Sequence, residues 1–130
     1  MNGITVDYRD RRPIYEQLVG NVCDLILRGI LQPDEQLPSV RALAAALGIN
    51  PNTIQKAYAE LERRKLVYSS PGRGSFVSSD LSKLAEEART LAMSALLDAV
   101  SEAKRIGISR EEVLRLIDTM WITEEGGERT

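Results

Sequence analysis

The most constraining feature of this sequence is a glycine turn between two short segments with helical periodicity. Before the turn, apolar residues recur at spacings of three, one and three: Val40, Leu43, Ala44 and Leu47. Ser39 can cap this helix, and Gly48 follows it at the position where a left-handed residue ends a helix. Two residues later, Asn50 can cap a second helix with Pro51 at its first position. Two helices joined by so short a turn form a helix-turn-helix.

The second helix has a polar first turn, and a predicted hairpin follows it. Its buried stripe comprises Ile54, Ala57, Tyr58 and Leu61, with Leu66 at its end. Residues 67–70 and 75–79 then flank the turn sequence Pro-Gly-Arg-Gly, which indicates two antiparallel strands. A helix-turn-helix followed by such a hairpin is a winged helix. The sequence therefore predicts a mainly α fold with an N-terminal winged helix-turn-helix, whose wing is a small β-hairpin.

The segments before this motif predict one more helix and a short strand. Residues 4–8 alternate apolar and polar side chains, as a strand does. Pro13 suits the first position of a helix that closes near Gly29. Its apolar stripe is Ile14, Leu18, Val22, Leu25 and Ile26. Residues 31–39 contain two prolines and two acids and are expected to be a linker.

Two amphipathic helices are predicted after the hairpin. Ser79 or Asp80 can cap a long helix that ends at Gly107, and Ser109 begins a capping box for a last helix of about 13 residues. We expect residues 124–130 to fray. The chain thus divides into a winged helix-turn-helix over 1–78 and a C-terminal helical hairpin over 79–130.

The C-terminal hairpin is the predicted dimerisation segment. One long and one shorter helix cannot bury both of their apolar faces alone, so two copies are expected to pack across a two-fold axis. The residues expected at this interface are Leu91, Leu96, Val100, Met120 and Trp121. The alternative is that the hairpin packs back on the helix over 13–29.

Composition excludes several classes of function. The chain has no histidine and only one cysteine, Cys23, which removes Ser/His/Asp and Cys/His catalytic sets and Cys/His zinc sites. No stretch is long and apolar enough for a membrane span, and the first residues are too polar for a signal peptide. We expect a cytoplasmic protein without cofactor, metal or catalytic residues. The remaining enzyme hypothesis relies on Asp/Glu chemistry.

Charge is distributed unevenly along a chain whose net charge is −2. Residues 1–78 carry ten Lys/Arg against eight Asp/Glu, whereas residues 79–130 carry seven against eleven. The polar face of the second helix suits DNA, because Asn and Gln amides pair with adenine edges while Thr and Lys contact phosphates. The residues on this face are Asn50, Asn52, Thr53, Gln55 and Lys56. The alternative is an ordinary solvated helix start.

Two isolated arginines extend the basic surface. Arg41 lies in the first turn of its helix, where the helix dipole disfavours a cation, so a phosphate is a suitable partner. Arg73 lies at the tip of the hairpin turn. Each also has a structural interpretation: Arg41 can pair with Glu35, and a turn arginine can face solvent without a function. The basic run at 63–65 favours a helix C-terminus regardless of DNA.

Three segments stand in a fixed order up to Ser78: RRPIYEQL, then ILQPDEQLPSVRALAAALGINPNTIQKAYAELERRKLV, and finally GRGSFV. Their combination of LPS, a following arginine, LG, NPNT and G-x-GSFV resembles the GntR family of bacterial transcription regulators. The NPNT start and the short C-terminal part look like the YtrA-type branch. That resemblance implies a homodimeric repressor, often of a transporter operon, which binds an inverted repeat in double-stranded DNA.

The resemblance also implies which residues contact DNA. They are Arg41, Asn50, Asn52, Thr53, Gln55, Gly72 and Arg73. Many relatives have arginine where this chain has Pro51 and Gln55, so the operator is expected to favour A·T pairs. The family's glycine before the wing is Lys65 here. The competing hypothesis is a winged helix that serves protein contacts only, without DNA binding.

Overall fold

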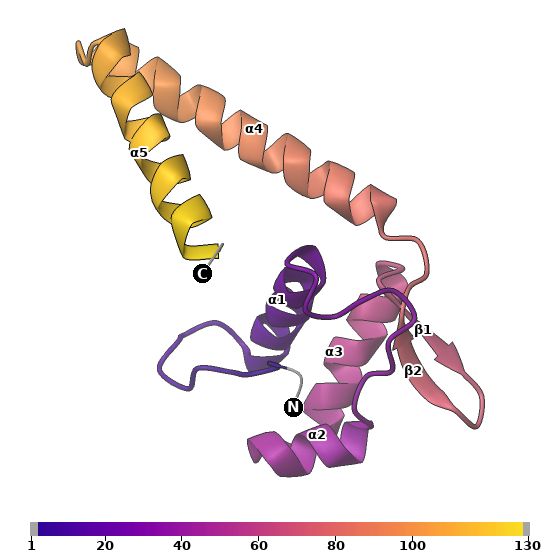
Figure 1. The fold of residues 1–130 in the computed structure, drawn as a ribbon. Coiled ribbons are helices and arrows are strands. Elements are labelled where there is room, and N and C mark those ends of the chain that lie inside the picture. The colour runs from indigo at the N-terminus through magenta and orange to yellow at the C-terminus, as the bar shows by residue number, and fades with distance from the viewer. Residues whose placement is uncertain (1–2, 129–130) are drawn as a thin grey trace. The chain divides into compact units, whose positions relative to one another are not determined.

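A computed structural model of the chain describes residues 3–128, with the backbone alone from residue 123 onward. Within this range the fold is mainly α, with five helices and one two-stranded antiparallel sheet (Figure 1). The elements are α1 (Ile14–Leu27), α2 (Val40–Leu47), α3 (Pro51–Arg63), β1 (Val67–Ser70), β2 (Gly74–Val77), α4 (Ser82–Arg105) and α5 (Arg110–Glu128). The chain forms two compact units, Met1–Glu86 and Glu87–Thr130, hereafter unit 1 and unit 2.

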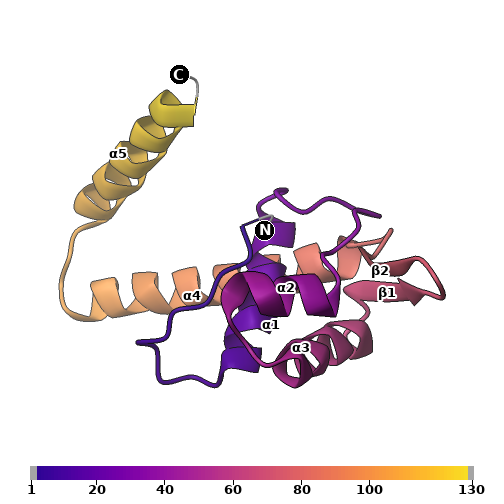
Figure 2. The same ribbon diagram turned by 90° about the horizontal axis from the view of Figure 1, so that it is seen from below.

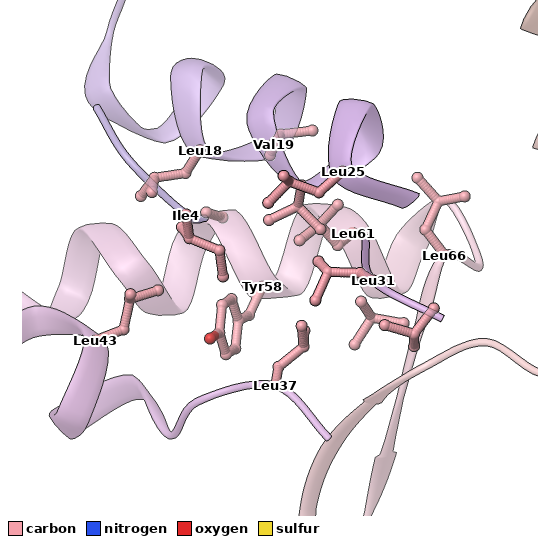
Figure 3. Packing of buried hydrophobic residues seen from close by; sticks show 14 of the residues in the cluster. Ile4, Leu18, Val19, Leu25, Leu31, Leu37, Leu43, Tyr58, Leu61 and Leu66 are labelled. Atoms are coloured by element: carbon pink, nitrogen blue, oxygen red, sulfur yellow. The ribbon is translucent and has the colours of Figure 1, made fainter. Parts of the chain in front are cut away.

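The core of unit 1 lies where α1 packs against α3, with α2 and the hairpin closing its ends (Figures 1 and 2). Leu18 and Leu25 of α1 point toward Leu61 and Tyr58 of α3, and Leu43 of α2 completes the cluster (Figure 3). The predicted stripe of α3 is confirmed, because all four of its residues are buried. Burial of these apolar side chains is the main force that holds the three helices together.

Local capping interactions set the boundaries of α2 and α3. The Ser39 Oγ accepts a hydrogen bond from the Ala42 amide at 3.0 Å, which caps α2. Gly48 ends that helix with φ +66°, in the left-handed region that favours glycine. The Asn50 Oδ1 accepts from the Asn52 amide at 2.8 Å and caps α3, with Pro51 at the first helical position. These predicted features of the helix-turn-helix are confirmed.

The segment between α1 and α2 is more than the linker that the sequence predicted. Leu31 and Leu37 are buried in the core. Residues 34–37 lie antiparallel to β2: the Leu37 amide donates to the Ser75 carbonyl at 2.9 Å, and the Val77 amide donates to the carbonyl of residue 35 at 2.8 Å. The prolines concealed this pairing, because they interrupt the alternation that identifies a strand. The segment thus pairs with β2 through an isolated bridge between Gln36 and Phe76, beside the two-stranded wing.

The predicted strand at residues 4–8 is absent from the structure, where this segment is irregular. Ile4 is buried, as its alternation with polar neighbours indicated. However, two side chains of α1 take the place of a partner strand: Asn21 accepts a hydrogen bond from the Thr5 amide, and Gln17 accepts one from the Asp7 amide, both at 2.9 Å. With its amides satisfied in this way, the segment needs no sheet.

Three helix ends also differ from the predictions. Pro13 caps α1 and precedes its first residue. At the other end of the motif, α4 starts at Ser82, later than a cap at Ser79 or Asp80 predicts, although the Asp80 carboxylate accepts from the Ser82 amide at 3.0 Å. The last helix, α5, continues to Glu128, so the expected fraying is wrong for residues 124–128. Residues 129–130, also in that expectation, lie outside the described residues.

Unit 2 is a helical hairpin with local stabilisation at its turn. Gly107 has φ +87°, and the Ile108 amide donates to the Ala103 carbonyl at 2.9 Å, which satisfies the end of α4. The Ser109 Oγ accepts from the Glu112 amide at 3.2 Å. No side chain described between residues 87 and 122 is buried. In the part of the chain that the structure covers, no helix is both long enough and apolar enough to cross a membrane.

Candidate nucleic-acid interface

The first turns of α3 separate a buried apolar side from an exposed polar side. Ile54 is fully buried, whereas Asn52, Gln55 and Lys56 are exposed and Thr53 is half-buried. The exposed amides provide both donors and acceptors, which match the N6 and N7 groups of adenine in the major groove. The helix therefore presents hydrogen-bonding groups on a rigid support, because its opposite side is anchored in the core.

Asn50 has a structural task in addition to the predicted one. Its Oδ1 is already used to cap α3, at 2.8 Å from the Asn52 amide nitrogen. The side-chain amide nitrogen keeps its donors, so Asn50 can donate to a phosphate or base while it continues to cap the helix.

Arg41 projects from the first turn of α2 with an exposed side chain. Among the side chains that the structure describes, those of residues 3–122, no acidic group forms a salt bridge with it. The Glu35 carboxylate, its alternative partner, instead accepts a hydrogen bond from the Gln32 amide at 3.2 Å. Arg41 is therefore available for an external anion at a helix N-terminus, where a phosphate is stabilised by the helix dipole as well.

The wing tip is built from a tight turn with an exposed arginine. Gly72 has φ +76°, and the Arg73 amide closes the turn by donating to the Ser70 carbonyl at 2.9 Å. The Arg73 guanidinium lies 5.3 Å from the centre of the Phe76 ring, which itself stacks on Tyr68 at 5.5 Å. This cation–π contact orients the arginine without neutralising its charge.

Two tyrosines that the sequence interpretation passed over support the candidate interface. The Lys56 ammonium lies 3.9 Å from the centre of the Tyr15 ring on α1. The Tyr8 hydroxyl donates to the Leu47 carbonyl at 2.6 Å, at the turn between α2 and α3. Both contacts cross from the N-terminal segment to the helix-turn-helix, so no local pattern could have indicated them.

Two of the three basic residues at the end of α3 pair with an acidic residue of the same helix. Arg63 and Arg64 both form salt bridges with Glu60, at 2.5 and 2.9 Å, and these hydrogen bonds lower the pKa of Glu60 to about 2. Lys65 has φ +63°, in the left-handed region that favours glycine, the residue that the resemblance predicts at this position. The wing forms after Lys65 nonetheless. These observations agree with a structural role for the run.

The predicted dimerisation residues all lie in unit 2. Leu91 and Leu96 of α4 and Met120 and Trp121 of α5 are exposed, and Val100 is half-buried. Val100 lines an apolar cavity of about 590 Å³ between α4 and α5, together with Ala103, Ile108, Val113, Leu114 and Ile117 and the basic side chains Lys104 and Arg110. The structure thus leaves a large apolar surface of this hairpin open.

No group of three or more potential metal ligands (His, Cys, Asp or Glu) occurs among the described residues. Among residues 3–122, the carboxyl groups with clearly shifted pKa values shift downward, chiefly because hydrogen bonds stabilise their charged forms, as in Asp10, Glu60 and Glu102. A lowered pKa suits a charged surface group rather than a general acid.

The chain is similar in sequence and in fold to known proteins. The model of the bacterial regulatory proteins, gntR family, matches residues 14–77. The HTH-type transcriptional repressor YtrA of Bacillus subtilis (strain 168) is 35% identical over 127 residues, which cover 97% of this chain and 98% of that relative. The crystal structure of a transcriptional regulator from Oenococcus oeni has a TM-score of 0.73 at 29% identity, covering 89% of this chain and 97% of that chain. The DNA-binding domain of AraR, crystallised with operator ORE1, has a TM-score of 0.50 at 30% identity over 56% of this chain and 89% of that chain.

Proposed function

This chain belongs to the GntR family of bacterial regulatory proteins and is a DNA-binding transcriptional regulator, and from that premise we propose that it acts in the cytoplasm as a dimeric repressor. The observation that carries the proposal is the two-sided α3, with Ile54 and Leu61 fully buried behind a polar, exposed first turn. Such a helix can enter the major groove without disturbing the core. YtrA, with which the chain shares nearly its full length, is itself a repressor.

The proposal assigns each candidate residue a type of contact. Asn52 and Gln55 would read base edges, and their amides favour A·T pairs. Thr53, Lys56 and Arg41 would contact phosphates beside the major groove. Gly72 and Arg73 at the wing tip would contact the flanking backbone or the minor groove, and Asn50 would add a donor at the start of α3.

Dimerisation would proceed through unit 2, as the residues of its open apolar surface suggest. Leu91 is 72% exposed and Trp121 is 64% exposed in the single chain, and exposed surface of this kind marks an interface. Leu96, Val100 and Met120 would contribute to the same contact. The dimer would then bind an inverted repeat whose half-sites are about one helical turn apart. An operon for a transporter is the expected target, from the resemblance to the YtrA-type branch.

A titration of the protein's own promoter region at several salt concentrations tests this function. Phosphate contacts release counterions, so affinity should fall steeply as salt rises. Arg41→Ala should weaken binding by about 1 to 3 kcal/mol and reduce the salt slope by about one unit, with folding intact. Arg28→Ala is the matched control, because Arg28 is exposed and pairs with Asp24 at the end of α1. Equal affinity for Arg41→Ala and wild type would remove Arg41 from the interface.

A flat salt response in the same titration would instead favour a winged helix that contacts proteins only. The AraR domain, to which this chain is similar, was crystallised in complex with operator DNA, which favours DNA binding over that alternative.

A further inference from the structure

The side chain of Gln36 ties the wing to the segment before α2. Its Nε2 donates a hydrogen bond to the Arg73 carbonyl at 2.8 Å, across 37 positions of sequence. Gln36 is exposed and contributes little to the hydrophobic core. Its contact is therefore directed at the turn that carries Arg73 rather than at the interior.

Gly74 leaves the space that this contact requires. A Cβ atom at this position would lie 3.0 Å from the Gln36 Nε2, and Gly74 has φ +119°, which other residues rarely adopt. The glycine therefore both permits the turn and lets the amide of Gln36 approach the wing backbone closely.

The backbone around Gln36 is hydrogen-bonded to β2. Residue 36 pairs with Phe76 of β2, and hydrogen bonds of 2.8 and 2.9 Å join the residues on either side of it to Val77 and Ser75. Three residues further on, Ser39 caps α2, whose second residue is Arg41. The segment that pairs with β2 at Gln36 thus leads directly into the helix that carries Arg41.

The wing turn has support from within the wing and from one outside residue. Ser70 pairs with Gly74, the Arg73 amide donates to the Ser70 carbonyl, and the Arg73 guanidinium lies over the Phe76 ring. The Gln36 side chain adds the bond to the Arg73 carbonyl from outside the wing. Without that bond the Arg73–Gly74 backbone would be less ordered before DNA binds, and ordering it on binding would weaken the complex.

We propose that Gln36 is a positioning residue that holds the wing tip so that Arg73 meets the DNA beside the half-site read by α3. This inference rests on the proposed function, because it requires Arg73 to contact DNA. Gln36 itself touches no base or phosphate in this scheme, and its effect on binding passes through the carbonyl of Arg73.

Gln36→Met tests the inference, since methionine has a similar length and no charge but cannot donate the hydrogen bond. We expect operator affinity to fall about three- to tenfold, the amount that one hydrogen bond accounts for. The thermal unfolding midpoint should fall by only the few degrees that one exposed hydrogen bond accounts for, because Gln36 is not part of the core. In the free protein, ¹⁵N relaxation should show lower backbone order parameters at Arg73 and Gly74 in the variant.

A double-mutant cycle separates positioning from a direct contact. In an Arg73→Ala background, Gln36→Met should have almost no further effect, whereas in an Arg41→Ala background its full effect should persist. An equal loss in both backgrounds would overturn the inference, as would unchanged order parameters at the wing tip.

The same cycle distinguishes failure of the inference from failure of the proposed function. If Arg73→Ala weakens binding but Gln36→Met does not, the wing contact stands and the role of Gln36 is wrong. If Arg73→Ala leaves operator affinity unchanged, the proposed wing contact fails and the inference fails with it.

Discussion

Units 1 and 2 are both built from helices in which apolar residues recur at helical spacing, yet they differ in burial. Every buried hydrophobic residue among those described lies between Ile4 and Val77, whereas α4 has no buried residue. In unit 1, α1 and α3 meet face to face while α2 and the wing close the ends of the core. In unit 2, two helices line an apolar cavity and bury none of the described side chains between them. Amphipathic pattern alone therefore does not complete a core; the number of packing partners does.

The difference separates the two tasks that we assign to the chain. A core completed within one chain keeps α2, α3 and the wing in place whether or not a partner is bound. An apolar hairpin without a core gains stability only when something covers it. DNA-reading geometry should thus be a property of the single chain, and dimer formation should depend on protein concentration.

The largest expected effect comes from removing a central side chain of unit 1. Leu61→Ala should lower the free energy of unfolding by roughly 3 to 5 kcal/mol, because Leu61 is fully buried between α1 and α3 and leaves a cavity. Chemical denaturation at several protein concentrations measures this effect. The loss should be the same at each concentration. A loss that disappears at high protein concentration would show that the core of unit 1 also depends on a partner.

A smaller effect of a different kind is expected in unit 2. Leu96→Asp should raise the dimer dissociation constant roughly 100-fold, about 3 kcal/mol, since a charge would enter the apolar interface without a partner. Sedimentation equilibrium measures the change, and binding to an inverted repeat should weaken with it.

Leu27→Asp is the matched control for this prediction. Leu27 is 46% exposed at the end of α1 in unit 1, and Leu96 is 48% exposed on α4. The same substitution at Leu27 should leave the dimer intact. A wild-type protein that is monomeric at micromolar concentration, or a dimer that tolerates Leu96→Asp, would contradict the role of unit 2.

The smallest effect concerns a single hydrogen bond inside unit 1. The Tyr58 hydroxyl donates to the Pro38 carbonyl at 2.6 Å, and burial raises the pKa of Tyr58 from 10.0 to about 12. Tyr58→Phe should cost about 1 kcal/mol at pH 8. Because the folded-state pKa lies above the unfolded value, the stabilisation is complete below pH 10 and is lost as the pH rises toward 12.

Unfolding free energies at pH 8 and pH 11 check this prediction. Wild type should lose more stability between the two values than Tyr58→Phe does. Parallel losses would mean that Tyr58 does not titrate with the raised pKa. Tyr8→Phe is a suitable control, since it also removes a 2.6 Å hydrogen bond to a carbonyl but at a tyrosine that is 66% exposed, and so separates the effect of burial from that of the bond.

Much of the helix-turn-helix could be predicted because its determinants are local. Ser39, Gly48 and Asn50 each act within a few residues of their own position, through a cap or a left-handed turn. The stripe of α3 repeats with the helical period, and the wing turn has its own glycines. Such features require no knowledge of the rest of the fold.

The contacts that surround the candidate interface could not be predicted in the same way. Tyr15 meets Lys56, Tyr8 meets Leu47, and the Gln36 amide meets the wing turn only after distant segments have packed together. At residues 4–8 the local pattern was misleading. Its alternation predicted a strand, but side chains of α1 accept hydrogen bonds from its amides and no strand forms.

By itself, then, the sequence determined the helices and the hairpin of this protein, the polar face of α3 and the family resemblance, because capping, turn chemistry and periodicity act over a few residues. Only the tertiary structure decided that residues 34–37 pair with β2, which side chains hold Lys56 and Arg73, and that unit 1 closes its core while unit 2 leaves its apolar face open. The physical reason is that burial and long-range hydrogen bonds depend on which segments meet, and a linear pattern does not specify the partner.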